Sequence, residues 1–548
     1  MSEVNIQPKS DVNLQIKMLN CKINGVQLSV KEGSTIIQAM YENQQKIAHY
    51  CWHPGLSIAG VCRLCMVEVA GNPRLQIACN TTVTEGMDIN NTSPKVVEAT
   101  KWGLDFHLIN HPLDCPVCDQ AGECGLQDQY MEFGQYNSEM AEPKTKKNKV
   151  VDLGPTIVLD SERCILCSRC VRFTDEVSKT NELGIFSRGD HAEIGTHAGK
   201  KLDNKYSLNT VDICPVGALT SKDFRFRQRA WYLKDAETIC NGCSTGCSTK
   251  VYFNKEGLFR VKPKHNEAVN GYWMCDEGRN TYKFVNKESR LLKSYQFKNG
   301  AWGNESTAGQ ASKNLVETMK SAKADEIALV LTGQHTVEEY TAIVEMFVNQ
   351  LKSKNIFHWN NNESTANDFD GLLIRGDKNP NSLGLIQILN QNGISAKWSE
   401  LESQLTSGSI KQLIVVGPEN IPVYTDIESK LNLFSKAEHL IYLSSASLPQ
   451  WENVKTLKHV TVIPMKTYIE KSGTFVNHAG LSQKFNKVTT VVNEALTVSD
   501  FAQIVSGNDL KIENLSENSL FMPTNQRADQ VTLEHRKKNE FVFNRGQF

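Results

Sequence analysis

The chain has 548 residues, of which 40% are hydrophobic and 22% are charged, and its formal net charge is -1. This length predicts three or four domains. The near-zero charge argues against nucleic acid or an acidic membrane surface as a partner. No apolar run is long enough to cross a bilayer, so no membrane span is expected.

Cysteine usage is the strongest compositional signal. All sixteen cysteines lie between Cys21 and Cys275, and the rest of the chain has none. The first residues resemble neither a secretory signal nor an Arg-rich transit peptide, so we expect a reducing cytosol. In that compartment cysteines are metal ligands more often than disulfides. The chain is therefore expected to have a metal-rich half and a metal-free half.

Residues 1–91 are predicted to form a small β domain. Leu14–Leu19 alternates apolar and polar residues like a half-buried strand, and Asn24-Gly25 favours a hairpin turn before a second strand, Val26–Val30. Ser34 is the expected N-cap of a short helix. Two strands and a helix are similar to the start of a β-grasp ferredoxin.

Four cysteines follow in this domain, with the spacing C-x10-C-x2-C-x13-C: Cys51, Cys62, Cys65 and Cys79. Four thiolates on the loops of a small β domain favour a [2Fe–2S] cluster. A zinc ribbon is the alternative, although ribbons usually have two CxxC pairs and only one is present here. Cys21 has no partner motif, and we expect it to be a small buried hydrophobe.

Residues 92–135 carry a second ligand set. A helix is predicted over Pro94–Asn110, with His107 on its surface. After it comes the spacing H-x3-C-x2-C-x5-C, whose members are His111, Cys115, Cys118 and Cys124. These residues can hold a [4Fe–4S] cluster. The alternatives are a zinc site, a [3Fe–4S] cluster held by the cysteines alone, or Asp114 as fourth ligand.

Residues 136–235 contain C-x2-C-x2-C followed far downstream by Cys-Pro. The four cysteines are Cys164, Cys167, Cys170 and Cys214. In two-cluster ferredoxins the fourth cysteine follows the triad after three residues and serves the other cluster. Thr174 occupies that position here, so the set is expected to hold one [4Fe–4S] cluster.

Residues 236–291 have the spacing C-x2-C-x3-C-x27-C, formed by Cys240, Cys243, Cys247 and Cys275. Thr249–Phe253 and Leu258–Val261 are predicted to pair as a hairpin between them. A β scaffold with four cysteines again favours [4Fe–4S], with zinc as the alternative.

Residues 292–548 alternate predicted strands and helices. Ile327–Leu331, Leu413–Val416 and Leu440–Leu443 read as buried strands, and Thr336 with Glu339 predicts a capping box. This pattern indicates α/β layers around a parallel sheet. No glycine-rich dinucleotide fingerprint or Walker A loop is present, so no nucleotide site is indicated.

The four spacings, in this order, resemble the large iron–sulfur subunit (the 75 kDa-like subunit) of respiratory complex I, an NADH:quinone oxidoreductase. The resemblance covers residues 14 to 290. It continues more weakly at Glu470–Gly480, which looks like a segment of the molybdopterin-oxidoreductase superfamily. It implies a multidomain α+β and α/β chain whose last domain is molybdopterin-oxidoreductase-like but cofactor-free.

The resemblance also implies the cofactors, partners and location. It implies one [2Fe–2S] and three [4Fe–4S] clusters on the sixteen ligands above, with no molybdopterin and no acid–base chemistry. Electrons would come from NADH through a flavin-binding partner subunit and leave to further iron–sulfur subunits and quinone, with proton translocation by the whole complex. The expected location is the cytoplasmic face of the bacterial inner membrane, as a peripheral subunit.

Two alternatives stay open. The diaphorase-type subunit of an NAD-linked hydrogenase or formate dehydrogenase shares the first motifs, but resembles only the first 230 or so residues. A zinc-stabilised scaffold without a redox role is the second.

Fifteen cysteines fall into groups of four, three, four and four, and the group of three is the one with a suitably spaced histidine, His111.

Overall fold

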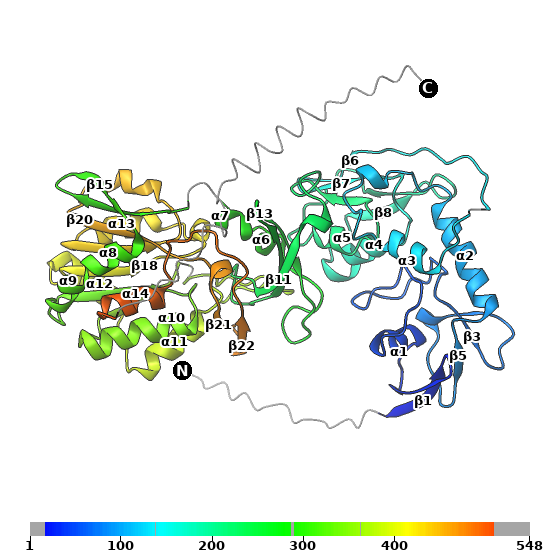
Figure 1. The fold of residues 1–548 in the computed structure, drawn as a ribbon, viewed down its shortest axis with the longest axis horizontal. Coiled ribbons are helices and arrows are strands. Elements are labelled where there is room, and N and C mark those ends of the chain that lie inside the picture. Colours follow the sequence, from blue (N-terminus) through cyan, green and yellow to red (C-terminus); the bar gives the residue numbers. More distant parts are fainter. Residues whose placement is uncertain (1–16, 138, 287–289, 362, 509–548) are drawn as a thin grey trace, which may run out of the picture. The chain divides into compact units, whose positions relative to one another are not determined.

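The computed structural model describes residues 17–137, 139–286, 290–361 and 363–508 (Figure 1). These residues form two compact units. Unit 1 comprises residues up to 204 together with 210–222, and unit 2 comprises 205–209 and the residues from 223 onward. Residues 14–16 of the first predicted strand and 509–548 of the last predicted domain lie outside the described residues. No helix in the described ranges is long and apolar enough to cross a membrane.

Unit 1 begins with a mixed five-stranded sheet of order β2-β1-β5-β3-β4 and one helix, as a β-grasp ferredoxin domain requires. Its elements are β1 (Met18–Ile23), β2 (Val26–Lys31), α1 (Ile36–Glu42), β3 (Met66–Val69), β4 (Gln76–Ile77) and β5 (Asp88–Asn90). The predicted turn is confirmed, because Asn24 and Gly25 both have positive φ, at 53° and 81°. Cys21 lies within β1 and is fully buried, as expected.

Two local predictions in this domain were wrong. The first strand begins at Met18 among the described residues and runs to Ile23, later than predicted. The N-cap of α1 is Thr35, not Ser34. Thr35 is the N-cap because Gln38 stands three residues later. The side chain of Gln38 accepts a hydrogen bond from the backbone N–H of Thr35, which completes a capping box.

The remainder of unit 1 is built from short elements joined by long loops. The predicted helix forms as α2 (Pro94–Leu108), capped by Ser93. The other α-helices and strands are α3 (Gly125–Phe133), β6 (Val151–Asp152), β7 (Ile157–Leu159), α4 (Arg169–Arg172), β8 (Leu183–Phe186), β9 (Glu193–Thr196), β10 (Leu219–Ser221) and α5 (Asn209–Asp212), whose first residue is assigned to unit 2. A π-helical turn, Phe173–Val177, continues α4.

His107 on α2 departs from its predicted position on the helix surface. Its ring is half-buried and meets the ring of Tyr50 edge-on, with 5.1 Å between the ring centroids. Its Nδ1 donates to the carbonyl oxygen of Gly103, one turn earlier. The histidine therefore packs between α2 and the loop that carries Cys51.

Unit 2 starts with the predicted hairpin, extended to a three-stranded antiparallel sheet of order β11-β12-β13. Its elements are β11 (Lys234–Ile239), β12 (Ser248–Asn254), β13 (Gly257–Pro263), α6 (Asp276–Arg279) and α7 (Tyr282–Val285). Their apolar side chains share one core with a late segment that includes β21 (Gly473–Val476) and β22 (Ser482–Phe485).

A seven-stranded sheet of order β15-β14-β20-β19-β18-β16-β17 forms the rest of unit 2. The strands are β14 (Ser294–Lys298), β15 (Ala301–Ser306), β16 (Ile327–Thr332), β17 (Ile356–Trp359), β18 (Gln412–Val416), β19 (His439–Ser444) and β20 (His459–Pro464). β16 to β20 are parallel, which confirms the predicted α/β layers.

Helices cover both faces of this sheet (Figure 1). One face packs on α8 (Ala308–Asn314), α9 (Val316–Lys320), α10 (Val337–Glu345), α11 (Ser382–Gln391) and α14 (Val498–Val505). The other packs on α12 (Trp398–Ser407) and α13 (Ile427–Phe434). Successive β16 residues alternate between the two cores, so the strand is apolar throughout.

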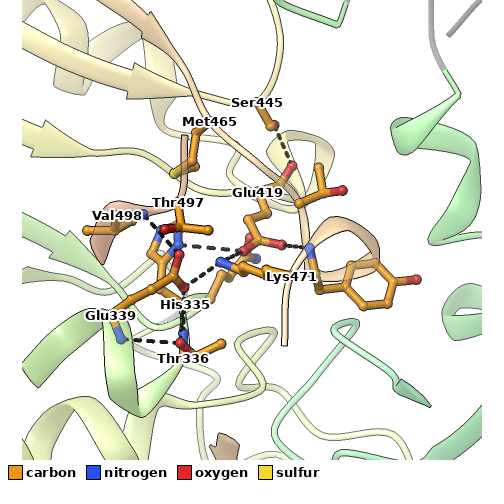
Figure 2. A network of polar contacts seen from close by, with 12 residues as sticks. His335, Thr336, Glu339, Glu419, Ser445, Met465, Lys471, Thr497 and Val498 are labelled. Carbon is orange, nitrogen blue, oxygen red and sulfur yellow. Dashed lines mark hydrogen bonds and ion pairs between the residues drawn. The ribbon is translucent and has the colours of Figure 1, made fainter. Parts of the chain in front are cut away.

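Figure 2 shows a network of polar contacts around Lys471, Glu339 and Glu419. The three side chains are buried, and Glu419 follows the carboxyl end of β18. Nζ of Lys471 lies 2.5 Å from Oε2 of Glu339 and 2.6 Å from Oε1 of Glu419. Glu339 completes the predicted capping box with Thr336. The strand order reverses between β16 and β18, where sheets of this kind commonly bind a ligand. Here the chain's own ammonium group lies between the two carboxylates.

Candidate iron–sulfur sites

The first ligand set lies in the β-grasp domain, and all four cysteines are buried. A hydrogen bond to Cys62 lowers the pKa of Cys51 to about 5, and the shared proton raises that of Cys62. Cys65 and Cys79 form a second such pair, and Cys79 lies in the electrostatic field of both Cys51 and Cys62. The four sulfurs therefore gather at one place. The backbone N–H of Tyr50 points at Sγ of Cys62, 3.4 Å away.

The third set, of ferredoxin type, lines one cavity in unit 1. Its members Cys164, Cys167, Cys170 and Cys214 share the cavity with apolar side chains, among them Leu159, Ile194 and Leu219. Burial raises the pKa of Cys164 to about 12 and that of Cys167 to about 11. Leu166 has a positive φ of 55°, and its N–H donates to Sγ of Cys164 at 3.4 Å.

The cysteines of the second set also lie close enough to interact electrostatically with one another. Burial is the largest effect on the pKa of Cys124 and raises it, and the nearby thiols of Cys118 and Cys115 raise it further. Cys124 is the N-cap of α3, and the N–H groups of Leu126 and Gln127 lower its pKa. Helix N-termini stabilise thiolates in this way. Cys115 is exposed, whereas Cys118 and Cys124 are buried.

His111 lies beside Arg163, whose guanidinium also faces Cys118. Burial, as the largest effect, lowers the pKa of His111 to about 4, and the positive charges of Arg163 and Lys144 lower it as well. The ring is therefore neutral at pH 7. Its Nδ1 is buried without a hydrogen-bond partner in the part of the chain that the structure describes. A neutral imidazole with an unpartnered nitrogen is the form that binds metals.

Asp114, the alternative fourth ligand, is engaged elsewhere. Its Oδ2 lies 2.6 Å from Nζ of Lys149 and 2.9 Å from Nη2 of Arg163. Although burial opposes it, these two cations lower the pKa of Asp114. The carboxylate is therefore neutralised by two cations and is the poorer candidate beside His111.

The second and third sets are in contact within unit 1. A Cβ atom at Gly217 would lie 2.2 Å from Sγ of Cys118, so only glycine fits at this position. Sγ of Cys124 lies 3.9 Å from the carbonyl oxygen of Pro215. The loop after Cys214 therefore packs directly on two cysteines of the second set, Cys118 and Cys124.

The fourth set lies in unit 2 and lines a cavity of its own. Its members Cys240, Cys243, Cys247 and Cys275 share it with three glycines and Lys378. The N–H of Gly242 points at Sγ of Cys240 at 3.4 Å, and that of Gly278 points at Sγ of Cys275 at 3.2 Å. Burial raises the pKa of Cys275 to about 12.

The donor chemistry of all four sets fits iron–sulfur clusters. Each set gathers soft sulfur donors in a largely buried place, and three sets have backbone N–H groups directed at a sulfur from 3.2 to 3.4 Å. Such hydrogen bonds stabilise charge on cluster sulfur and tune its potential. The tight contact at Gly217 and the positive φ at Leu166 are features that motif reading alone missed.

Comparison with known proteins defines the class first. Four family models match, described as a 2Fe-2S iron-sulfur cluster binding domain (residues 16–94), an NADH-ubiquinone oxidoreductase-G iron-sulfur binding region (103–139), an NADH-quinone oxidoreductase subunit 3 ferredoxin-like domain (154–220) and a molybdopterin oxidoreductase Fe4S4 domain (233–287). The chain is thus a multidomain protein with [2Fe–2S] and [4Fe–4S] binding domains.

Individual relatives make the resemblance specific. NADH dehydrogenase [ubiquinone] iron-sulfur protein 1 of Solanum tuberosum is 38% identical over 61% of this chain and 45% of its own length. The NADH-ubiquinone oxidoreductase 75 kDa subunit of Reclinomonas americana is 36% identical over 62% of this chain and 49% of its own length. The resemblance to the large iron–sulfur subunit of complex I is confirmed, and the match spans about half the length of these relatives.

A solved structure matches a shorter part of this chain. A chain of an NAD+-reducing [NiFe]-hydrogenase in the H2-reduced state is 28% identical, and the match covers 38% of this chain and 90% of that one, with a TM-score of 0.35. A TM-score at that level does not establish a shared fold.

Proposed function

We propose that this chain is the electron-transfer subunit of an NADH:quinone oxidoreductase of the complex I type. The observation that carries the proposal is the set of sixteen ligand side chains, fifteen cysteines and His111, in four groups of four whose order resembles the 75 kDa-like subunit. One [2Fe–2S] and three [4Fe–4S] clusters are the proposed cofactors, and bound clusters supply one-electron carriers.

The residues of this chain hold and tune these carriers. Cys51, Cys62, Cys65 and Cys79 are the proposed [2Fe–2S] ligands. The proposed [4Fe–4S] ligands are His111 with Cys115, Cys118 and Cys124; Cys164, Cys167, Cys170 and Cys214; and Cys240, Cys243, Cys247 and Cys275. Burial excludes water from most of these sulfurs, and the directed N–H groups favour the more negative, reduced state.

Contacts within unit 1 support a relay through its three sites. The loop after Cys214 touches Cys118 and Cys124, and the buried hydroxyl of Tyr50 lies in the field of both Cys124 and Cys62. Electrons arrive from NADH through the flavin of a partner subunit, pass these three sites, and leave to a further iron–sulfur subunit and quinone. The His111 site is the proposed exit, and the fourth site is proposed to lie off this path.

Partners and location follow from the same proposal. The flavin-binding subunit and other iron–sulfur subunits of the complex are the proposed partners, on the cytoplasmic face of the bacterial inner membrane. Molybdopterin is not part of the proposal. Residues 292–548 contain no cysteine to ligate molybdenum, and Lys471 forms ion pairs with Glu339 and Glu419 at the sheet's switch point.

Isolation of the tagged chain from its native cells tests this function. We expect it in the membrane fraction, together with a flavoprotein and further iron–sulfur subunits. NADH should reduce its electron paramagnetic resonance (EPR) signals, and added quinone should reoxidise them. Recovery only in a soluble hydrogenase or formate dehydrogenase would support the diaphorase-type alternative. Zinc without acid-labile sulfide would support the scaffold.

A further inference from the structure

One face of the helix that contains Cys170 contacts the loop that carries Cys51. Arg169, Arg172 and Glu176 stand at positions i, i+3 and i+7 along α4 and its π-helical continuation, so they point in similar directions. All three bond to residues of the segment 51–57, more than 110 positions earlier in the chain. Both elements belong to unit 1.

Arg172 and Glu176 hold the two ends of this loop. Nη2 of Arg172 donates to the carbonyl oxygen of Cys51 at 2.5 Å, and Nη1 donates to that of Ser57. The carboxylate of Glu176 accepts from the backbone N–H of Ser57 at 2.8 Å and from its hydroxyl group. The loop after the first [2Fe–2S] ligand is thereby fixed to the helix that contains Cys170.

Arg169 joins two proposed cluster sites with a single side chain. Its Nη2 donates to the carbonyl oxygen of Trp52 at 2.6 Å, next to Cys51. Its Nη1 donates to the carbonyl oxygen of Ile213 at 3.1 Å, next to Cys214. The planar guanidinium fork suits such a two-ended bridge, and a lysine ammonium does not.

The charge of this bridge is not cancelled by a carboxylate. Within the described ranges, neither Arg169 nor Arg172 forms an ion pair with Asp or Glu, and the polar partners of Arg169 are carbonyl oxygens. Arg169 lies in the field of Cys167 and Cys214 from one site and of Cys51 from the other. Its positive charge therefore acts on ligands of both sites.

We propose that Arg169 is a positioning residue shared by the [2Fe–2S] site and the ferredoxin-type [4Fe–4S] site. It fixes the two ligand loops against each other, and its charge favours the reduced state at both sites. This inference rests on the proposed function, because it requires clusters at these sites. A nearby positive charge stabilises the more negative, reduced form and so raises the reduction potential.

Potentiometric titration of the full-length, cluster-loaded chain, followed by EPR, tests the inference. In Arg169→Gln, which is neutral but still donates hydrogen bonds, the reduced-to-oxidised ratio at fixed potential should fall roughly tenfold at both sites, the size expected for one unit charge in a partly buried site. Arg169→Lys loses the two-ended bridge but keeps the positive charge, so both ratios should stay within about threefold of wild type. Arg188→Gln, at an exposed position of unit 1, is the matched control and should change neither.

The outcomes separate this inference from the proposed function. A shift at only one site or at neither in Arg169→Gln, or an equal shift in Arg169→Lys or Arg188→Gln, would overturn the inference alone. A wild-type chain with zinc and without EPR signals would overturn both proposals. If Arg169→Gln fails to assemble its clusters, Arg169→Lys decides, because a tenfold fall in that variant contradicts the role of the charge.

Discussion

Replacement of Lys471 by Met tests the buried network at the end of the parallel sheet. The side chains of Lys471, Glu339 and Glu419 are 2%, 3% and 0% exposed, so water cannot replace the lost ammonium group. Removing one partner of a buried ion pair typically costs about 3–5 kcal/mol. Although burial raises the pKa of Glu339, Lys471 together with His335 lowers it to about 2, below its ordinary 4.5. We therefore expect a loss of about 3–5 kcal/mol in the stability of unit 2.

The sign of the pH dependence follows from the same residues. The folded pKa of Glu339 lies below its unfolded value, so its contribution is present above about pH 4.5 and is lost as the pH falls toward 2. In Lys471→Met the two carboxylates lack their cation, so their pKa values rise. The difference between variant and wild type should therefore shrink as the pH falls from 7 to about 4.

Hydrogen exchange in peptides from β16 and β18 measures this stability locally, where global two-state unfolding of two units does not apply. Lys484→Met, at an exposed position on β22, is the matched control and should stay within about 0.5 kcal/mol of wild type. A loss below about 1 kcal/mol in Lys471→Met, or a loss that grows on acidification, would refute the reasoning.

Three further predictions concern unit 1. His111→Ala should lose about four iron atoms per chain and one [4Fe–4S] EPR signal, while Asp114→Asn keeps both; the reverse pattern would make Asp114 the ligand. Gly217→Ala should disturb the signal of the second set, because its methyl group would meet Sγ of Cys118, whereas Gly303→Ala has open space and should bind iron normally. Cys21→Ala should lower stability by about 1 kcal/mol with unchanged iron content, and a loss of iron would show that Cys21 is a ligand.

The four proposed ligand sets could be recognised in the sequence because their members are close in the chain or have a specific spacing. The parallel strands could also be predicted from the sequence. β16, for example, is buried on both faces, so its sequence is a continuous apolar run. The N-cap of α1 could also have been found, because only Thr35 has a Gln three residues later.

Long-range side-chain contacts could not be predicted. Lys471 reaches Glu339 across 132 positions, and Arg169 reaches Trp52 across 117. No sequence motif links either residue to its partner, and a lysine or arginine is usually solvent-exposed, so the sequence gives no reason to pair them. His107 was misplaced for the same reason, because its packing against Tyr50 depends on a loop more than fifty residues earlier.

Metal and sulfide analysis of the anaerobically purified chain tests the central claim most directly. The four sites predict about 14 iron atoms and about 14 acid-labile sulfides per chain, from one two-iron and three four-iron clusters. About 4 zinc ions per chain without sulfide would contradict the account, because that content is what a zinc-stabilised scaffold requires.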